Sequence, residues 1–318
     1  MSELEEKTAP WIARHAIQQE ISSFDGTSLN TYHAIPDRAK VVIVMVHGFC
    51  GFFGKYHELF QHFYEAGYAP FFLELRGHGK SSNRRCFADK RVTVGSFEEY
   101  AGDIHAYVNW IRKQYPALPR FLFAHSMGGA AGALELEEHP DDFACAILSS
   151  PMLEMNFGKL PEPAVDALSV YAKVKHLDDD YAPGQHAWTG KYDPANSSCD
   201  SEKRYAYQFH QRQADPDYQT WGGTYGWARA AKQGSEKALQ NAGKVRIPVL
   251  ICQASRDTMV LNEGEQIFKM RSANTSLVQY DSRHEIFAAN DEVFNRYVKD
   301  LVTFYDVQTK KLETARAD

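Results

Sequence analysis

One serine of this chain lies where an apolar run changes into a helix-favouring segment. Ser126 is the third residue of the sequence Ala-His-Ser-Met-Gly at 124–128, and the apolar residues 121–123 come directly before it. Small residues two positions before and after a serine let a strand and a helix approach closely across a tight turn, with the hydroxyl at the apex. The pattern predicts a nucleophilic serine, and the alternative is a strand–helix turn whose serine has no chemical role.

A serine hydroxyl is a poor nucleophile near neutral pH unless a base takes its proton and an acid orients that base. His284 and Asp257 suit these two roles, because each follows an apolar run that is typical of a strand, at 276–280 and at 248–252. The carboxyl ends of parallel strands collect at one edge of a sheet, so we expect both side chains to meet Ser126 there.

Each of these residues also has a plainer interpretation. Asp257 could cap a turn or a helix, where aspartate is common, and His284 could be a loop histidine, since the chain holds 13 histidines. Asp281 and Glu285 are rival acids, but both lie too close to His284 along the chain to reach its ring from a separate strand end. We therefore expect Ser126 as the nucleophile, His284 as the base and Asp257 as the acid.

Acyl transfer also needs hydrogen-bond donors for the oxyanion of the tetrahedral intermediate. The N–H of Met127, directly after the expected nucleophile, is one candidate. The second candidate is the N–H of Phe49, in the sequence His-Gly-Phe at 47–49 that follows the apolar run 41–46. The alternative is an ordinary turn at the end of a strand, with Phe49 as a core residue.

The sequence Arg-Gly-His-Gly at 76–79 follows another apolar run and could suggest a phosphate-binding loop. It lacks the Gly-Lys-Ser/Thr ending of a P-loop and the G-x-G-x-x-G spacing of a dinucleotide site. We therefore expect this segment to have a structural role.

Apolar runs typical of buried strands alternate with amphipathic segments typical of helices, which predicts an α/β fold with a mainly parallel central sheet flanked by helices. The expected strands are a hairpin across 20–33 with its turn at Asp25-Gly26, and runs at 41–46, 71–75, 121–123, 143–148, 248–252 and 276–280. The expected helices cover 58–66, 97–114, a segment that begins at 130, and 291–305, followed by a frayed end at 309–318.

Strand-like runs disappear between 152 and 244, where aromatic and charged residues mix. We expect three parts: residues 1–151 as the first part of the core, 152–244 as an inserted, mostly helical cap, and 245–318 as the second part of the core. Aromatic residues at helical spacing more often form a core than the wall of an acyl-binding groove. Those that do line a groove would offer an apolar bed for one acyl chain.

The chain has 318 residues, of which 44% are hydrophobic, and a formal net charge of −6 without a basic cluster. These values suit one large domain with an insertion, or two domains, and argue against nucleic acid as the main partner.

The five scattered cysteines, Cys50, Cys86, Cys145, Cys199 and Cys252, lack metal-ligand spacing and indicate reduced thiols. No apolar run approaches about 20 residues, so we expect a cytoplasmic protein with room for peripheral contact with a membrane.

The chain resembles the α/β-hydrolase family over nearly its whole length, and in particular its lysophospholipase and monoacylglycerol lipase branch. The motifs that carry the resemblance are His-Gly-Phe at 47–49, Arg-Gly-His-Gly-Lys-Ser at 76–81, Ala-His-Ser-Met-Gly-Gly at 124–129 and Arg-His-Glu at 283–285, with segments 150–152 and 221–227 similar to bacterial lysophospholipases. The chain order Ser126, Asp257, His284 is also that of the family. Two residues depart from the usual pattern: Ala124 replaces Gly, and Glu74 stands where Asp is usual.

The resemblance implies a helical cap over the site, the three catalytic residues named above, and hydrolysis of a monoacyl lipid ester without cofactor or metal. The expected function is a serine carboxylic-ester hydrolase for lysophospholipid or monoacylglycerol, acting through an acyl-enzyme on Ser126. One alternative is a short-chain esterase or aminopeptidase of the same fold, and another is a catalytically idle binding module. The expected partner is a small lipid ester, and the sequence indicates no oligomeric state.

Overall fold

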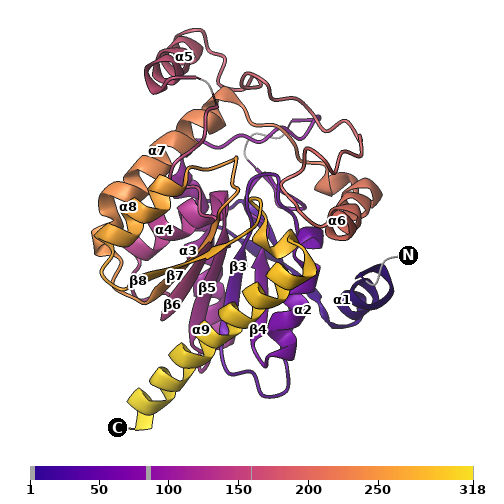
Figure 1. The fold of residues 1–318 in the computed structure, drawn as a ribbon, viewed down its shortest axis with the longest axis vertical. Helices are drawn as coiled ribbons and strands as arrows, with labels where there is room; N and C mark the ends of the chain where they lie inside the picture. Colours follow the sequence, from indigo (N-terminus) through magenta and orange to yellow (C-terminus); the bar gives the residue numbers. More distant parts are fainter. Residues whose placement is uncertain (1–3, 84–86, 159, 318) are drawn as a thin grey trace.

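The computed structural model of the chain describes residues 4–83, 87–158 and 160–317. Within these residues eight strands form a central sheet with helices on both faces (Figure 1). The strands are β1 (Ile17–Ser22), β2 (Ser28–His33), β3 (Val42–Val46), β4 (Ala69–Leu73), β5 (Arg120–His125), β6 (Cys145–Ser149), β7 (Val249–Ala254) and β8 (Thr275–Tyr280). Their order across the sheet is β1-β2-β4-β3-β5-β6-β7-β8. Because β2 is antiparallel to both neighbours and all other pairs are parallel, the expected α/β arrangement is confirmed.

The first hairpin turns at Asp25-Gly26, as the sequence predicts. Gly26 has φ +84°, in the left-handed region that glycine adopts without steric cost. The position of β4 differs from the expected range of 71–75, because this strand begins and ends two residues earlier. The N–H of Leu75 donates to the Nε2 atom of His47 at 3.0 Å, so the chain has left the strand ladder by that point.

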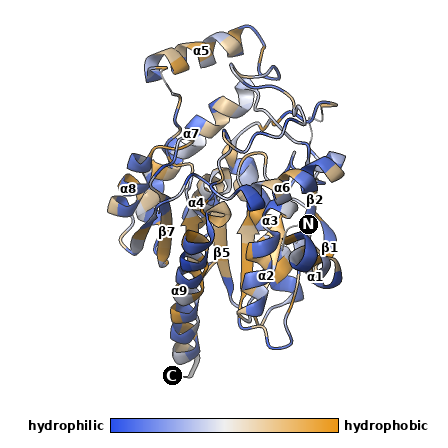
Figure 2. Cartoon of the chain, turned by 45° about the vertical axis from the view of Figure 1, so that its right-hand side comes forward, coloured by the Kyte–Doolittle hydropathy of each residue, from blue (hydrophilic) through white to orange (hydrophobic). Residues whose placement is uncertain are grey.

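Alternate side chains of β3 face opposite sides of the sheet, as in any strand. One face is covered by α3 (Phe97–Gln114), α4 (Met127–Glu138), α7 (Tyr225–Asn241) and α8 (Asn262–Arg271), and the other by α1 (Ala9–His15), α2 (His57–Glu65) and α9 (Asp291–Ala317). Val44 packs in the first of these layers and Met45 in the second. This two-sided cover explains why the run 41–46 is apolar at every position, and Figure 2 shows hydrophobic residues concentrated on the strands.

The last helix is longer than the sequence suggested. α9 runs from Asp291 to Ala317, whereas we expected a helix to 305 and a frayed end at 309–318, so that expectation was wrong. The hydroxyl of Thr309 donates to the carbonyl of Tyr305 at 2.8 Å, and Leu312 packs against the core cluster that contains Tyr305. Burial of Thr309 and partial burial of Leu312 therefore continue the helix beyond 305, and residues 313–315 after them are exposed.

The described part of segment 152–244 contributes helices but no strand to the sheet. Its helices are α5 (Glu162–Val174), α6 (Glu202–Ala214) and α7, and α5 lies farthest from the sheet (Figure 1). α7 differs from the other two, because its Trp227 and Ala231 are buried in the same cluster as α3 and α4. We keep the division into 1–151, 152–244 and 245–318 as a proposal, in which α7 joins the inserted segment to the core.

Four cysteines lie within the described residues, and all four are buried and carry free thiols: Cys50, Cys145, Cys199 and Cys252. Burial raises the pKa of each of these thiols, which keeps them in the unreactive, protonated form. The fifth, Cys86, lies outside the described residues.

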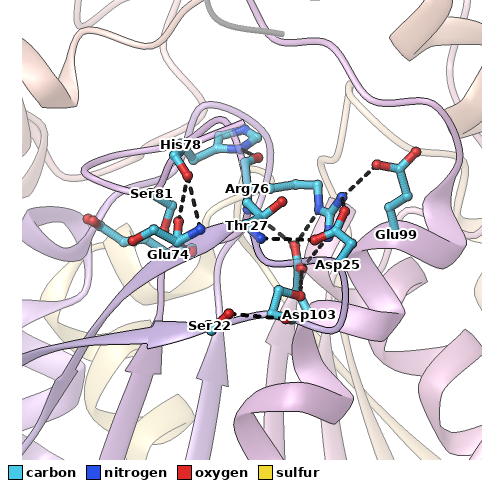
Figure 3. Close-up of polar contacts among 12 residues, drawn as sticks. Ser22, Asp25, Thr27, Glu74, Arg76, His78, Ser81, Glu99 and Asp103 are labelled. Carbon is cyan, nitrogen blue, oxygen red and sulfur yellow. Dashed lines mark hydrogen bonds and ion pairs between the residues drawn. The ribbon is translucent and has the colours of Figure 1, made fainter. Parts of the chain in front are cut away.

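Arg76 is fully buried, and three carboxylates surround its guanidinium group (Figure 3). Nε and Nη2 donate to the two oxygens of Asp103 on α3 at 2.8 and 2.6 Å, and Nη1 donates to Glu99 at 2.7 Å and to Asp25 at 3.0 Å. Asp25 belongs to the β1–β2 turn, and Arg76 belongs to the loop after β4. The network therefore ties the hairpin, this loop and α3 together, which gives segment 76–79 the expected structural role.

We expect Arg76→Ala to lower the free energy of unfolding by about 3–5 kcal/mol, because it leaves buried carboxylates without their counter-charge. Urea denaturation at neutral pH measures this change. The matched control is Arg296→Ala, which removes an exposed arginine 3.6 Å from Asp300 and should cost no more than about 1 kcal/mol. Equal losses in the two variants would contradict a structural role for the buried network.

Candidate active site

Ser126 lies at the sharp turn between β5 and α4. Its backbone has φ 53° and ψ −118°, a strained combination for a residue with a side chain. Backbone hydrogen bonds hold it there: its N–H donates to the carbonyl of Ser149 at 3.0 Å, and its carbonyl accepts from Met152 at 2.9 Å and Ala130 at 3.1 Å. These bonds hold the turn against the end of β6 and the start of α4, as expected for a serine between a strand and a helix.

The small residues around Ser126 are required by close packing. A Cβ atom on Gly128 would lie 2.4 Å from the carbonyl oxygen of His47, and one on Gly129 would lie 2.7 Å from the Cβ of Pro151. Ala124, the position where the family usually has glycine, faces Gly132, whose added Cβ would lie 3.2 Å from the Ala124 Cβ. The missing side chain at Gly132 therefore leaves room for the methyl group of Ala124.

The structure brings Ser126, His284 and Asp257 together in one line. The Nε2 atom of His284 lies 2.8 Å from the Ser126 Oγ, and its Nδ1 atom lies 2.6 Å from the Asp257 Oδ2. With the proton on Nδ1, the imidazole donates to Asp257 and accepts from the serine hydroxyl. The three side chains are nearly inaccessible to solvent, so the arrangement can move a proton from hydroxyl to imidazole beside a fixed carboxylate.

The second oxygen of Asp257 performs the turn-capping role that the sequence left open. Its Oδ1 accepts the N–H groups of Met259 at 2.8 Å and Val260 at 3.1 Å. Both interpretations of this residue are therefore compatible, because one carboxylate oxygen orients the turn and the other contacts the imidazole. The backbone donors also fix the carboxylate in place.

The two rival acids have other partners. The carboxylate of Asp281 is exposed and accepts from Arg256 at 2.6 Å. Glu285 is buried, forms an ion pair with Lys55, and accepts a hydrogen bond from Ser198 at 2.8 Å. The sequence indicated Glu285 as a rival acid and as part of the Arg-His-Glu motif at 283–285, and it gave no role to Lys55.

The segment that carries the Phe49 amide lies against Ser126. A Cβ on Gly48 would lie 2.9 Å from the Cβ of Ser126, so only glycine permits this approach. Among the described residues, the N–H groups of Phe49 and Met127 have no acceptor, which leaves both free to bind an anion. The ring of Phe49 packs on Trp227 with centroids 4.2 Å apart and lines the cavity described below, so its side chain has a packing role as well.

Buried polar groups hold this segment in position. The Tyr56 hydroxyl accepts the N–H of Gly48 at 3.1 Å and lies 3.0 Å from the Nδ1 atom of His125. The carboxylate of Glu74 accepts the N–H of Phe53 at 3.1 Å and of Lys80 at 2.9 Å. Burial raises the pKa of Glu74 to about 7 despite these donors. The glutamate that replaces the usual aspartate thus reaches from the β4 loop to the loop after β3.

An apolar cavity of about 460 Å³ opens beside Ser126, between the core and segment 152–244. Its apolar lining includes Phe49, Met152, Met155, Phe157, Leu160, Val165, Leu168, Tyr225, Trp227, Met259 and Val260. The aromatic residues of segment 152–244 therefore fall into two groups, those that line the cavity and those that are placed elsewhere. Tyr225 and Trp227 line this cavity, while Tyr207 is buried and contacts His57 at 2.7 Å.

A group of side chains elsewhere could share a metal ion by distance alone. Within the part of the chain that the structure describes, ligand atoms of His105, Glu135 and His139 lie within 4.8 Å of one another. Glu135 is nine residues beyond Ser126, about 13 Å along the helix axis. Because His105 already contacts Asp142 at 2.7 Å, we treat this group as a polar cluster between α3 and α4 that lies apart from Ser126.

The chain matches the family model described as serine aminopeptidase, S33, over residues 37–292. It is 27% identical to lysophospholipase L2 of Escherichia coli (strain K12) over 83% of this chain and 80% of that protein. It is 28% identical to a monoacylglycerol lipase of Mycolicibacterium smegmatis over 84% of this chain and 88% of that protein. A soluble variant of monoglyceride lipase from Saccharomyces cerevisiae, solved with a substrate analogue, has a TM-score of 0.71 at 20% identity, over 92% of this chain and 95% of that one.

The ion pair of Glu285 gives the stability of the site a defined pH dependence. Burial alone would raise the pKa of this carboxyl, but the Lys55 ammonium and the neighbouring donors outweigh it and lower the pKa from 4.5 to about 2. A carboxyl group whose pKa is lowered on folding stabilises the folded state at pH values above its ordinary pKa. This stabilisation is lost as the pH falls from about 4.5 towards 2. At roughly 1.4 kcal/mol per pH unit, the loss is about 3 kcal/mol.

We therefore expect the difference in free energy of unfolding between wild type and Glu285→Gln to be largest above pH 5 and to shrink as the pH falls to 3. Urea denaturation across this range measures it. The control is Glu20→Gln, at an exposed position of β1, which should change the free energy of unfolding by no more than about 0.5 kcal/mol. A difference for Glu285→Gln that does not vary between pH 6 and pH 3 would contradict the lowered pKa.

Proposed function

This chain belongs to the serine aminopeptidase S33 family of α/β-hydrolases and is a serine hydrolase, and from that premise we propose that it hydrolyses the ester bond of monoacyl lipids, either lysophospholipids or monoacylglycerols. The observation that carries the proposal is the position of Ser126 on the wall of an apolar cavity. A cavity of this kind takes an acyl chain out of water and holds its ester carbonyl beside the hydroxyl.

In the first half of the reaction, His284 takes the proton of Ser126 as Oγ attacks the ester carbonyl. Asp257 keeps the imidazole proton on Nδ1 and stabilises the imidazolium that forms. The N–H groups of Phe49 and Met127 donate to the oxyanion, in a site where burial strengthens each hydrogen bond. The ester C–O bond then breaks, the alcohol leaves with the proton from His284 Nε2, and the acyl group stays on Ser126.

In the second half, water takes the place of the alcohol. His284 removes a proton from the water as its oxygen attacks the acyl carbonyl, and the same two N–H groups stabilise the second oxyanion. The Ser126–acyl bond breaks, Oγ recovers its proton from the imidazole, and a fatty acid is released. Both halves use the same three side chains and require no other reactant than the ester and water.

The charges of the cavity lining favour the lipid proposal over an aminopeptidase of the same family. An aminopeptidase must bind the free ammonium group of its substrate, which calls for an unpaired carboxylate near the serine. The carboxylates that line this cavity are Asp166 and Glu236, and both form ion pairs with Lys232, at 3.1 and 2.5 Å. A panel of p-nitrophenyl esters of rising chain length, beside aminoacyl arylamides, tests this, and a preference for arylamides would overturn the lipid proposal.

The outermost helix offers an apolar surface for lipid aggregates. Val170, Tyr171 and Val174 of α5 are each more than half exposed, while Val165 and Leu168 of the same helix line the cavity. Within the described residues no helix is long and apolar enough to cross a bilayer. We infer that α5 touches the membrane or micelle surface from which a monoacyl lipid passes into the cavity.

We expect Ser126→Ala to lower kcat/KM for lysophospholipid and monoacylglycerol hydrolysis by about 10⁴-fold or more, because it removes the atom that forms the acyl-enzyme. Release of fatty acid from lipids of one chain length measures this loss. Labelling by a fluorophosphonate separates the enzyme from an idle binding module, because wild type should be labelled and the variant should not. Wild-type activity in Ser126→Ala, or no labelling of folded wild type, would contradict the mechanism.

The assignment of the acid can be tested with a matched pair of variants. Asp257→Asn should lower kcat by about 10³–10⁴-fold, because the amide cannot hold the imidazole in the required tautomer. Asp281→Asn, at the exposed rival position, should keep kcat within about threefold of wild type. The measurement is steady-state kinetics on a soluble p-nitrophenyl ester, and a larger loss in the Asp281 variant would move the acid role to that residue.

A further inference from the structure

Arg212 of α6 is a buried cation without a carboxylate partner in the described chain. Its side chain is only 7% exposed, and its one hydrogen bond runs from Nη2 to the carbonyl of Cys50 at 2.6 Å. Its Nε atom is buried with no acceptor among these residues. The guanidinium lies 4.9 Å from the ring centre of Phe52 and 4.7 Å from that of Trp221. Aromatic faces stabilise a cation only modestly, so desolvation of this charge is incompletely offset.

Arg212 lines a second cavity, of about 580 Å³. Its other cations are already paired: Lys55 with Glu285, and Lys191 with Asp193 at 3.5 Å. The charged side chains of the lining therefore leave one net positive charge, on Arg212. A cavity lined by a guanidinium group that has no carboxylate partner among the described residues suits an anion with several oxygens.

The two cavities share one lining residue, next to the loop that holds Asp257. Met259 lines both of them, and its N–H donates to Asp257. Arg212 bonds the carbonyl of the residue directly after Phe49, so its guanidinium lies within about 10 Å of the Phe49 N–H. In a lysophospholipid, the ester carbonyl carbon and the phosphorus are about 8 Å apart when the glycerol backbone is extended. With the acyl chain in the first cavity, the phosphate can therefore reach Arg212 in the second.

We propose that Arg212 binds the phosphate of a lysophospholipid head group and so makes a phosphate-bearing monoacyl lipid the preferred substrate over a monoacylglycerol. This inference rests on the proposed function and specifies the substrate class of the same site. The guanidinium acts as a specificity-determining group: it contacts the alcohol half of the ester, and the reacting carbonyl remains with Ser126 and the two N–H donors. Loss of the lipid alcohol then releases the phosphate from this cavity.

The test compares two substrates that differ in the phosphate, lysophosphatidylglycerol and monoacylglycerol of the same acyl chain, each in mixed micelles with a neutral detergent. The quantity measured is the ratio of kcat/KM for the first over the second. We expect Arg212→Gln to lower this ratio by about 10-fold to 100-fold, since a hydrogen bond to a charged group is worth that factor. Arg212→Lys should keep part of the ratio, because an ammonium retains the charge without the planar fork.

The matched control is Lys191→Gln, which removes a paired cation from the lining of the same cavity and should keep the ratio within about twofold. Because Arg212 also holds the Cys50 carbonyl, absolute rates can fall on both substrates, and the ratio separates phosphate recognition from that loss. An unchanged ratio in Arg212→Gln, or an equal fall in Lys191→Gln, would overturn the inference.

Inorganic phosphate as a competing anion distinguishes a lipid head group from a free anion. If phosphate inhibits wild type but not Arg212→Gln while the substrate ratio is the same in both proteins, the cavity binds free anions, and the proposal for the head group is wrong. Failure of the proposed function has a different signature, because wild type would then hydrolyse neither lipid while still cleaving short p-nitrophenyl esters.

Discussion

The imidazole of His284 must lie within hydrogen-bond distance of two side chains from distant parts of the chain, and the parallel sheet meets this requirement. β5, β7 and β8 point the same way, so the residues that follow them emerge at one edge. Ser126 comes directly after β5, Asp257 follows β7 and His284 follows β8. A reversal of any of these strands would carry one of the three groups to the opposite edge.

The strained backbone of Ser126 is the second requirement, and close packing of the neighbouring residues offsets this strain. The left-handed backbone at this residue persists because Gly128 and Gly129 let α4 pack onto the end of β3 and onto Pro151. Gly48 lets the loop after β3 lie against the serine, and Tyr56 and Glu74 hold that loop through backbone N–H groups. The Arg76 network then fixes the adjacent β4 loop to α3 and to the hairpin.

The sequence predicted well the strands that are covered on both faces and the helices whose buried residues are regularly spaced. The run at 41–46 and the helix at 97–114 correspond closely to β3 and α3, because the first is apolar at every position and the second has a clear apolar period. The position of Ser126, Asp257 and His284 next to one another also followed from strand ends. Glu285, Lys55 and Arg212 could not be assigned, since a charge is read from sequence as exposed unless its partner or its burial is known. The end of α9 was missed for the same reason, because a charged segment gave no sign of the apolar contact at Leu312.

The carboxylate of Glu285 connects segment 152–244 to the loop that carries His284. Ser198 and Cys199 both donate to it from within segment 152–244, and the residue immediately before it is His284. Lys55 supplies a third donor from the segment that follows β3. Three segments that lie far apart in the sequence therefore share one buried carboxylate directly beside His284.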